Sequence, residues 1–309
     1  MRGQFETETG QAANATFGAY VVQSLGDDVL IGISNDPGNS DGALLVRSAD
    51  GASFTPERVL DEQGVHDIQV QAGVGWVPGT DPTDDWTFGN LYRRSEAGVW
   101  SKLRTLPLTI HALGLWHDGA AIWVAGGMHT GDNATWRGRI LKSIDAGATW
   151  TAVDVNHYRV YDVIGFSGRL YAVGYEYNGA YSQDLHVSSD DGATWPKVAT
   201  VKPLLKPRLT VWNGQLIVAG NACLYAVHSD GAVSVHALPF SIVDGWNVLA
   251  EGGDGYLYVL SASGVYRSND FITWHYYCAL ASAISLARWG TDLLMSEVGL
   301  NARIWRVPL

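Results

Sequence analysis

Aromatic side chains stand beside carboxylate and amide groups in several segments that are rich in turn-forming residues. The candidates for ligand binding in these segments are Asp85, Trp86, His129, Trp136, Tyr175, Glu176 and Tyr177. Aromatic rings can stack on sugars while carboxylates bond sugar hydroxyls, and the same rings make rigid anchors in protein interfaces. This composition predicts a surface that binds a glycan or a protein. An exposed polar loop surface without a ligand is the alternative.

A second group of candidates combines histidine, aspartate and arginine at the starts of predicted strands. Two imidazoles and two carboxylates, the latter from Asp67 and Asp162, could hold a metal ion if these strand starts meet. Ligands from separate strands show no diagnostic spacing, so we predict neither a metal nor a cofactor, and we assign no catalytic residue. The members that we expect to bind a ligand are His66, His111, Asp162, Arg208 and Trp246.

The elements that would position these residues are marked by a repeated motif, here called the acidic turn. Two clear copies read Ser143-Ile-Asp145-Ala-Gly147-Ala-Thr149-Trp150 and Ser188-Ser-Asp190-Asp-Gly192-Ala-Thr194-Trp195. An Asp carboxylate can accept backbone N–H groups in such a turn, and glycine supplies the backbone freedom, so we interpret the motif as structural. Weaker copies begin at Ser48 (with Asp50), Ser95, and Ser268 (with Asp270 and Trp274).

The motif recurs at intervals of about 39 to 48 residues, which is the length of one four-stranded propeller blade. The sequence therefore predicts an all-β, seven-bladed β-propeller of antiparallel blades, formed by residues 1–309 as a single domain. Six or eight blades are the alternatives. The seven first strands are expected to start near Ala19, Asp67, His111, Tyr161, Leu209, Trp246 and Ile284.

The last blade needs a strand from elsewhere, because the chain ends after its third strand, Arg303 to Val307. The segment from Gln4 to Thr9 is strand-like and belongs to no complete blade. We therefore expect residues 1–10 to complete the last blade, which would close the ring and remove an exposed sheet edge.

The acidic turns at Ser143 and Ser188 match the consensus S-x-D-x-G-x-T-W in full, and the chain thereby resembles the Asp-box (bacterial neuraminidase repeat) propellers. The resemblance covers nearly the whole chain as a repeat and implies the sialidase-like fold. That family includes sialidases, xyloglucanases, sorting receptors, assembly factors and lectin-like binders, so the fold does not fix the function. In the family, the turns lie between third and fourth strands, on the face away from the ligand.

The opposite face would carry the loops between second and third strands. Four of these loops are long, which places the expected binding surface over blades one to four. They are Asn35–Gly42, Val77–Gly89, Gly126–Gly138 and Gly174–Asp184, whereas Gly220–Ala222 and Ala262–Gly264 are short.

Three classes of function compete. A sialidase-like glycoside hydrolase is the enzymatic alternative, but no F-R-I-P-type motif precedes the first acidic turn, and Arg2 is the only Arg before Arg47. A non-catalytic module that recognises a glycan or a protein is favoured. A virion or assembly component is the third class, because the segment from Trp86 to Arg93 looks similar to propellers of phage tail-associated proteins.

Charge and composition exclude other partners. The net charge is −11, and the sequence contains no stripe of basic residues, so nucleic-acid binding is not expected. Neither a signal peptide nor a membrane-spanning run is found, so we expect no membrane insertion; a virion or extracellular location and assembly into a larger complex remain open. Cys223 and Cys278 are too few for a disulfide framework and are expected to be small buried apolar groups.

Overall fold

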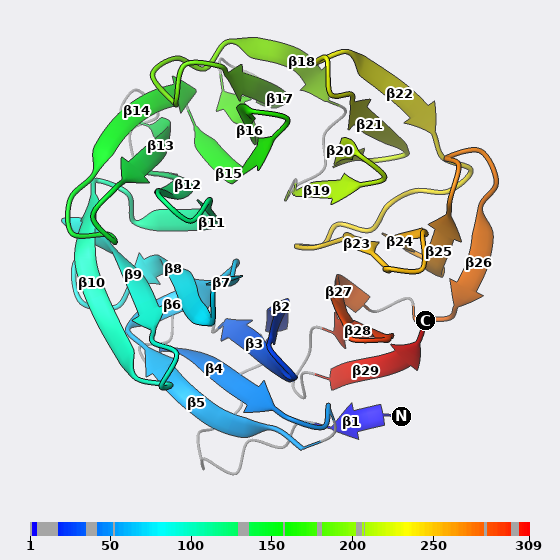
Figure 1. Cartoon of the computed structure of the whole chain (residues 1–309), viewed down its shortest axis with the longest axis horizontal. Coiled ribbons are helices and arrows are strands. Elements are labelled where there is room, and N and C mark those ends of the chain that lie inside the picture. The colour runs from blue at the N-terminus through cyan, green and yellow to red at the C-terminus, as the bar shows by residue number, and fades with distance from the viewer. Residues whose placement is uncertain are drawn as a thin grey trace.

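The computed structural model describes residues 2–4, 18–34, 42–51, 53–128, 136–156, 158–177, 181–201, 206, 208–280, 283–297 and 303–309. Within these residues every regular element is a β-strand. Five four-stranded sheets and one nine-stranded sheet are arranged as a ring around a common axis (Figure 1). The protein is thus an all-β, multi-bladed β-propeller.

Each four-stranded sheet is an antiparallel meander. One contains β2 (Gly18–Leu25), β3 (Asp28–Ser34), β4 (Ala43–Ser48) and β5 (Thr55–Leu60). The next two contain β15 (Arg159–Phe166), β16 (Arg169–Tyr177), β17 (Tyr181–Ser188) and β18 (Lys197–Val201), then β19 (Leu209–Trp212), β20 (Gln215–Gly220), β21 (Cys223–Val227) and β22 (Val233–Ala237). The last two contain β23 (Leu249–Glu251), β24 (Leu257–Ser261), β25 (Gly264–Ser268) and β26 (His275–Cys278), then β27 (Ala283–Trp289), β28 (Asp292–Glu297), β29 (Arg303–Pro308) and β1 (Arg2–Gln4).

The nine-stranded sheet curls where two meanders meet. Its strands are β6 (Glu62–Val65), β7 (Gln69–Gln71), β8 (Val74–Pro82), β9 (Phe88–Arg94), β10 (Trp100–Pro107), β11 (His111–His117), β12 (Ile122–Met128), β13 (Arg137–Ser143) and β14 (Thr151–Asn156). A single residue pair, His111 with Thr80, joins β11 to β8. The long β8 also pairs with β7 near its start and with β6 near its end.

The predicted first strands coincide with strands of the structure. β2, β7, β11, β15, β19, β23 and β27 each begin within a few residues of the expected position, and they are the strands closest to the ring axis (Figure 1). Their apolar side chains are buried between neighbouring sheets, as in the cluster that contains Val163, Val160 and Trp123. Burial of apolar side chains between the sheets is the main force that holds such a ring together.

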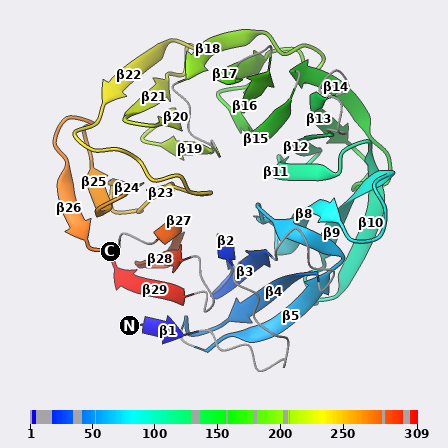
Figure 2. The same ribbon diagram turned by 180° about the vertical axis from the view of Figure 1, so that it is seen from behind.

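The two termini meet in one sheet. β1 pairs antiparallel with β29, Arg2 opposite Trp305 and Gln4 opposite Arg303, so the N-terminal strand covers the edge left by the C-terminal one (Figure 2). The prediction placed this strand at Gln4 to Thr9, whereas the structure has it at Arg2–Gln4. Residues 5–9 lie outside the described residues.

The acidic turns form hydrogen bonds within themselves. Asp145 Oδ1 accepts from the Ser143 hydroxyl at 2.8 Å and from the Thr149 backbone N–H at 2.9 Å. Asp190 repeats both contacts, at 2.8 and 3.0 Å, with Ser188 and Thr194. Hydrogen bonds from the threonine lower the pKa of Asp145 and Asp190 to about 2. Each carboxylate therefore stays charged and fixes the turn that follows the third strand of its sheet.

The Ser–Asp bond is also present in two of the three weaker copies, whereas the copy at Ser95 has Ala97 in place of the Asp. The Ser48 hydroxyl donates to Asp50 Oδ1 at 3.0 Å, and the Ser268 hydroxyl donates to Asp270 Oδ1 at 3.0 Å. Hydrogen bonds, led by that of the Thr273 backbone, lower the pKa of Asp270 to about 2. The aromatic residues that end the copies pack beneath them, Trp195 buried, and Trp150 and Trp274 half-buried.

Glycines in the acidic turns contact the preceding sheet. A Cβ on Gly192 would lie 2.5 Å from the Trp123 ring, and one on Gly51 would lie 2.5 Å from the Trp289 ring. Both glycines have positive φ, +84° and +68°. Glycine is thus required twice over, by the backbone conformation and by the close approach of an indole. The turns therefore link one sheet to the next.

Two predicted long loops are shorter than expected. β8 continues to Pro82 and β9 begins at Phe88, so the predicted loop Val77–Gly89 reduces to residues 83–87. The predicted loop Gly174–Asp184 is mostly the ends of β16 and β17, whose pairing runs to Tyr177 opposite Tyr181. In the first segment β8 is held as a strand by its pairing with β6 and β9, and in the second the tyrosines of β16 and β17 favour strand continuation. Most of Asn35–Gly42 and half of Gly126–Gly138 lie outside the described residues.

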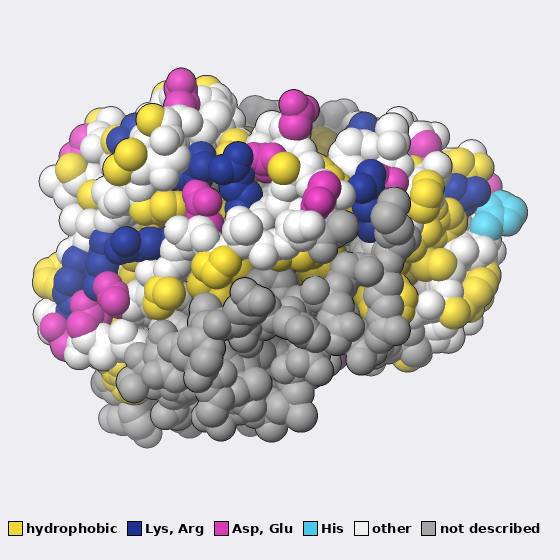
Figure 3. Space-filling view, turned by 90° about the horizontal axis from the view of Figure 1, so that it is seen from below, with side chains coloured by type: hydrophobic (Ala, Val, Ile, Leu, Met, Phe, Trp, Pro, Cys, Tyr) yellow, Lys and Arg dark blue, Asp and Glu magenta, His cyan; other side chains and the backbone are white. Residues whose placement is uncertain are grey.

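The surface carries both signs of charge. Basic and acidic side chains are interspersed over the described part of the side shown in Figure 3. Cys223 is buried and Cys278 is half-buried, and both are free. Among the described residues, no helix has the length and hydropathy needed to cross a membrane.

Candidate functional site

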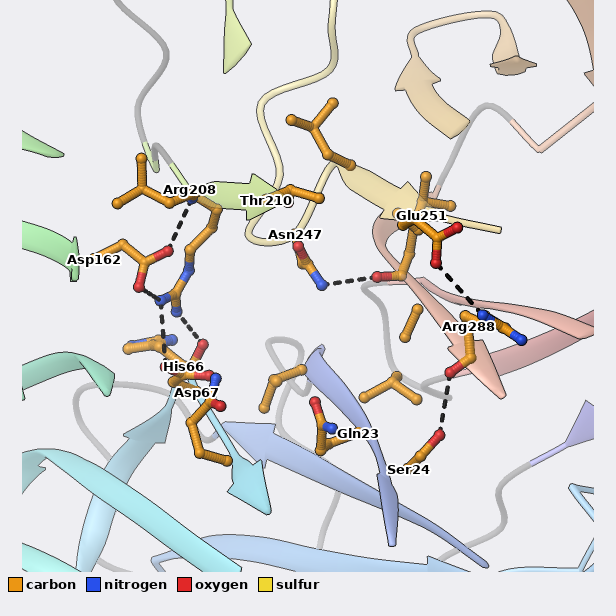
Figure 4. A pocket seen from close by; sticks show the side chains of 18 residues that line it. Gln23, Ser24, His66, Asp67, Asp162, Arg208, Thr210, Asn247, Glu251 and Arg288 are labelled. Atoms are coloured by element: carbon orange, nitrogen blue, oxygen red, sulfur yellow. Dashed lines mark hydrogen bonds and ion pairs between the residues drawn. The ribbon is translucent and has the colours of Figure 1, made fainter. Parts of the chain in front are cut away.

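Arg208 occupies the centre of the ring, just before β19 (Figure 4). Its side chain is buried, and Nη1 lies 3.7 Å from Asp67 Oδ2 and 3.5 Å from Asp162 Oδ1. The guanidinium also donates to three backbone carbonyls, those of His66, Leu113 and Tyr161. Arg208 therefore ties together segments that precede or begin three different inner strands.

Every carboxylate oxygen of Asp67 and Asp162 accepts a hydrogen bond from the backbone. Each oxygen accepts one N–H, from Ile68 and Leu115 for Asp67 and from Val163 and Leu209 for Asp162. Burial raises the pKa of both carboxyl groups, although Arg208 opposes that rise. Arg208 is thus the cation that pairs with these two acids. Its guanidinium occupies the position between Asp67 and Asp162 that a metal bound by both carboxylates would need. Among the described residues, no three His, Cys, Asp or Glu side chains are grouped to hold a metal.

A cavity of about 250 Å³ lies beside the Arg208 side chain (Figure 4). The Ser24 hydroxyl donates to the Arg288 carbonyl at 3.2 Å, and Arg288 Nη1 lies 3.4 Å from Glu251 Oε2. Each guanidinium in the lining therefore faces a carboxylate of the same lining. The other polar side chains that line the cavity include Gln23, Thr210 and Asn247.

An aromatic group lies next to the Arg208 network. The rings of His66 and Trp246 stack with centroids 3.6 Å apart, and Lys206 Nζ lies 4.8 Å from the centre of a Trp246 ring. Tyr161 contacts both Trp246 and Tyr175, with centroids 6.5 and 5.6 Å apart. Burial lowers the pKa of the His66 imidazole well below its usual value, so this ring is neutral at pH 7.

His111 is buried between an acid and a base. Its Nδ1 lies 2.6 Å from Asp81 Oδ1, and its Nε2 lies 3.1 Å from Arg159 Nη2. Burial lowers the pKa of His111, although Asp81 opposes that shift. His111 therefore belongs to a polar cluster between β8, β11 and β15 and has little surface for a ligand.

Trp86 is the most exposed of the predicted ligand-binding aromatics that the structure describes. It lies between β8 and β9 with 57% of its surface exposed. Phe88 and Leu108, also exposed, belong to the same corner of the sheet, because Phe88 pairs with Pro107. Asp85 Oδ1 accepts the Thr87 N–H at 2.8 Å, which fixes the backbone around Trp86.

The other predicted residues are distributed differently. Trp136 is half-buried against Tyr158, with centroids 4.7 Å apart. Tyr175 is buried and Glu176 is half-buried, both on β16. Tyr177 is described only as the last backbone position of β16, and His129 lies outside the described residues.

A buried acid, Glu62 on β6, was not among the residues predicted from the sequence. Its side chain is fully buried, and Oε1 accepts from the Asn90 amide and, at 3.1 Å, from the Tyr92 hydroxyl. A Cβ on Gly79 would lie 2.3 Å from Glu62 Cδ, so glycine at that position makes room for the acid. Burial raises the pKa of Glu62 to about 8.

The structure thus divides the predicted site in two. His66, Asp162, Arg208, Trp246 and, through Tyr161, Tyr175 lie together near the axis, where they are enclosed and bonded to one another. Trp86 and Asp85 lie on the periphery and are open to solvent. Sequence reasoning missed Lys206, Glu62 and the Arg288–Glu251 pair, because nothing in their local pattern marks them.

No family model matches the chain, and no curated protein matches it. Solved structures do. A puromycin hydrolase shares 15% identity at a TM-score of 0.62, over 91% of this chain and 50% of that one. The extracellular domain of a putative one-component system, BT4673, from B. thetaiotaomicron shares 14% sequence identity at a TM-score of 0.64, over 99% of this chain and 40% of that one. A protein of unknown function from Dyadobacter fermentans shares 12% sequence identity at a TM-score of 0.54, over 95% of both chains.

These likenesses show the β-propeller fold alone. The chain spans half or less of the length of the puromycin hydrolase and of the BT4673 domain. The resemblance to the Asp-box family and the sialidases rests on the turn motif, and that to the phage tail propellers rests on residues 86–93; neither finds support in these matches.

Proposed function

We propose that the ring has seven blades. The nine-stranded sheet counts as two blades, β6–β10 and β11–β14, which only the pairing of His111 with Thr80 merges into one sheet. Each of the seven inner strands then opens a blade of four strands, with β1 as the fourth strand of the last. β6 and β7 pair with consecutive parts of β8 in registers that differ by one residue, so we count them together as the interrupted inner strand of the second blade.

We propose that the protein is a non-catalytic recognition module, which binds a glycan or a protein through the face that carries the β8–β9 connection, here called the loop face. The observation that carries the proposal is the exposure of Trp86 beside Phe88 and Leu108. Indole rings supply a large contact area with little loss of side-chain entropy, and they dominate the energetics of many interfaces. The exposed residues that carry the proposal belong to the second of the four blades over which the sequence predicted the binding surface.

An ion-pair network supports the loop that carries Trp86. Lys102 Nζ lies 2.9 Å from both Asp61 and Asp84, and Arg104 contacts Asp84 at 2.8 Å and also pairs with Asp85. Single exposed ion pairs contribute little, but a linked set restricts the loop to one conformation. A surface that is ordered before binding loses less entropy when the partner arrives.

The state of the central acids favours binding over catalysis. A glycoside hydrolase of the two-carboxylate type needs both acids within reach of the substrate. Asp67 and Asp162 are buried, and their oxygens are occupied by backbone N–H groups and Arg208. The acids nearest the ring centre therefore hold the blades in place.

The test is a binding assay with two variants. The protein and its Trp86→Ala variant are compared on a glycan array and in capture of proteins from the source cells. Ile144→Ala, a replacement of an exposed apolar residue on an acidic turn, is the control. We expect Trp86→Ala to lose at least tenfold in affinity and the control to bind as the parent does. Equal binding by all three proteins would show that Trp86 does not contribute to binding.

A further inference from the structure

A groove of about 550 Å³ lies between two neighbouring sheets on the face of the acidic turns. Its walls come from the β11–β12, β15–β16 and β17–β18 connections, which all lie at the same end of their sheets. This face is the opposite one from that of the β8–β9 connection. The volume falls within the range of about 300 to 1,000 Å³ that small-ligand pockets occupy.

The apolar part of the groove is formed by aromatic residues held in place by their neighbours. Trp116 and Phe166 are half-buried. A Cβ on Gly165 would lie 2.9 Å from Trp116 Nε1, so the absence of a side chain there lets the indole edge pack against β15. Trp123 is buried beside them and packs on Gly192 of the acidic turn. The aromatic surface is therefore rigid before any ligand arrives.

The polar rim of the groove carries two carboxylates. Asp118 Oδ1 accepts the N–H groups of Ala120 and Ala121 at 2.8 and 2.6 Å, which orients the acid. Burial opposes ionisation, but these hydrogen bonds outweigh it and lower the pKa of Asp118, so the group is charged at pH 7. Asp191, whose side chain is 75% exposed, pairs with Lys142.

From this arrangement we propose that the groove binds one neutral hexopyranose residue, free or at the end of a glycan. The apolar C–H face of a pyranose fits against Trp116 and Phe166, and its hydroxyl groups donate to the carboxylates of Asp118 and Asp191. Rim groups that accept hydrogen bonds suit a ligand rich in hydroxyl donors.

The same rim discriminates against charged sugars. The Asp118 carboxylate repels a uronic or sialic acid, because like charges at close range destabilise one another; Asp191 adds less repulsion, since Lys142 pairs with it. The base in the lining, Arg169, is turned toward the next sheet, where its Nη1 donates to the Asp230 carbonyl at 3.3 Å. The groove therefore selects neutral over acidic sugars.

The experiment measures binding of defined glycosides by calorimetry and by saturation-transfer NMR. The probes are the methyl glycosides of glucose, galactose and mannose, with methyl glucuronide as the acidic counterpart, at up to about 10 mM so that millimolar Kd values are detected. We expect at least one neutral glycoside to bind saturably. Methyl glucuronide should bind at least tenfold more weakly.

Three variants locate the site. Trp116→Ala and the isosteric Asp118→Asn should each weaken binding at least tenfold, and Trp86→Ala on the loop face should bind as the parent does. Asp118→Asn keeps the test valid if Trp116→Ala does not fold. No saturable binding of any neutral glycoside, or binding that neither groove variant changes, overturns the proposal. Loss in Trp86→Ala alone would assign the sugar to the loop face, which separates this inference from the proposed function.

Discussion

Replacement of Glu62 by Gln should stabilise the protein and remove one component of its pH dependence. Glu62 Oε2 and Asn90 Oδ1 are both buried without a hydrogen-bond partner among the described residues. An ionised carboxylate in this position lacks both solvent and a nearby cation in contact. Glutamine has the shape of the neutral acid and carries no charge at any pH.

The magnitude follows from the shift in pKa. Burial raises the pKa of Glu62 from 4.5 to about 8. Because the folded state holds this proton more tightly than the unfolded state, the contribution of Glu62 is most favourable below about pH 4.5 and falls as the pH rises to about 8. At about 1.4 kcal/mol per pH unit, the whole change is about 5 kcal/mol.

The assay is urea unfolding of the parent and Glu62→Gln at several pH values. We expect the difference in free energy of unfolding to grow by about 1.4 kcal/mol per pH unit between about pH 5 and 8, and then to level off. Glu96→Gln makes the same chemical change at an exposed position and is the control. A difference for Glu62→Gln that does not vary with pH would show that burial does not raise the pKa of Glu62.

Further predictions test the ring and its turns. Deletion of residues 1–10 removes β1 from the edge of β29 and should lower the melting temperature by several degrees; unchanged thermal unfolding would contradict the closure. Gly192→Ala should cost about 1–3 kcal/mol more in urea unfolding than Gly168→Ala, because both have positive φ but only Gly192 meets an indole. Asp145→Asn should remove a stabilisation that is present above about pH 4 and lost as the pH falls toward about 2, seen as melting temperatures that converge in acid. Arg208→Met leaves two buried carboxylates without their cation and should destabilise by about 3–5 kcal/mol in urea unfolding, more at neutral than at acid pH; an equal loss at both would contradict the pairing.

The repeat in the sequence was sufficient to predict the strands but not the loops. The spacing of the acidic turns placed β11, β12 and β13 nearly where they lie, because each turn must follow a third strand. The segment Val77–Gly89 was misread, since its Gly, Pro and Asp residues are typical of loops. In the structure β8 pairs with four other strands, and these tertiary contacts outweigh local preference.

The candidate site was predicted in part for a similar reason. Sequence reasoning brought Asp162 and Arg208 to the ring centre, because both lie at the starts of inner strands. It could not show that they pair with each other, since the partners are far apart in the chain and no local pattern records their contact. Glu62 was missed because its burial depends on the space left by Gly79 on another strand.

The most direct test of the recognition role is a hydrogen–deuterium exchange map of the protein with its glycan or protein partner bound. We expect protection at residues 83–88 and 107–109, around Trp86 and Leu108, in addition to any protection that a hexose in the groove gives to the turn at Ser188. Protection confined to the turns that begin at Ser143 and Ser188, with Trp86 left exposed, would contradict the recognition role.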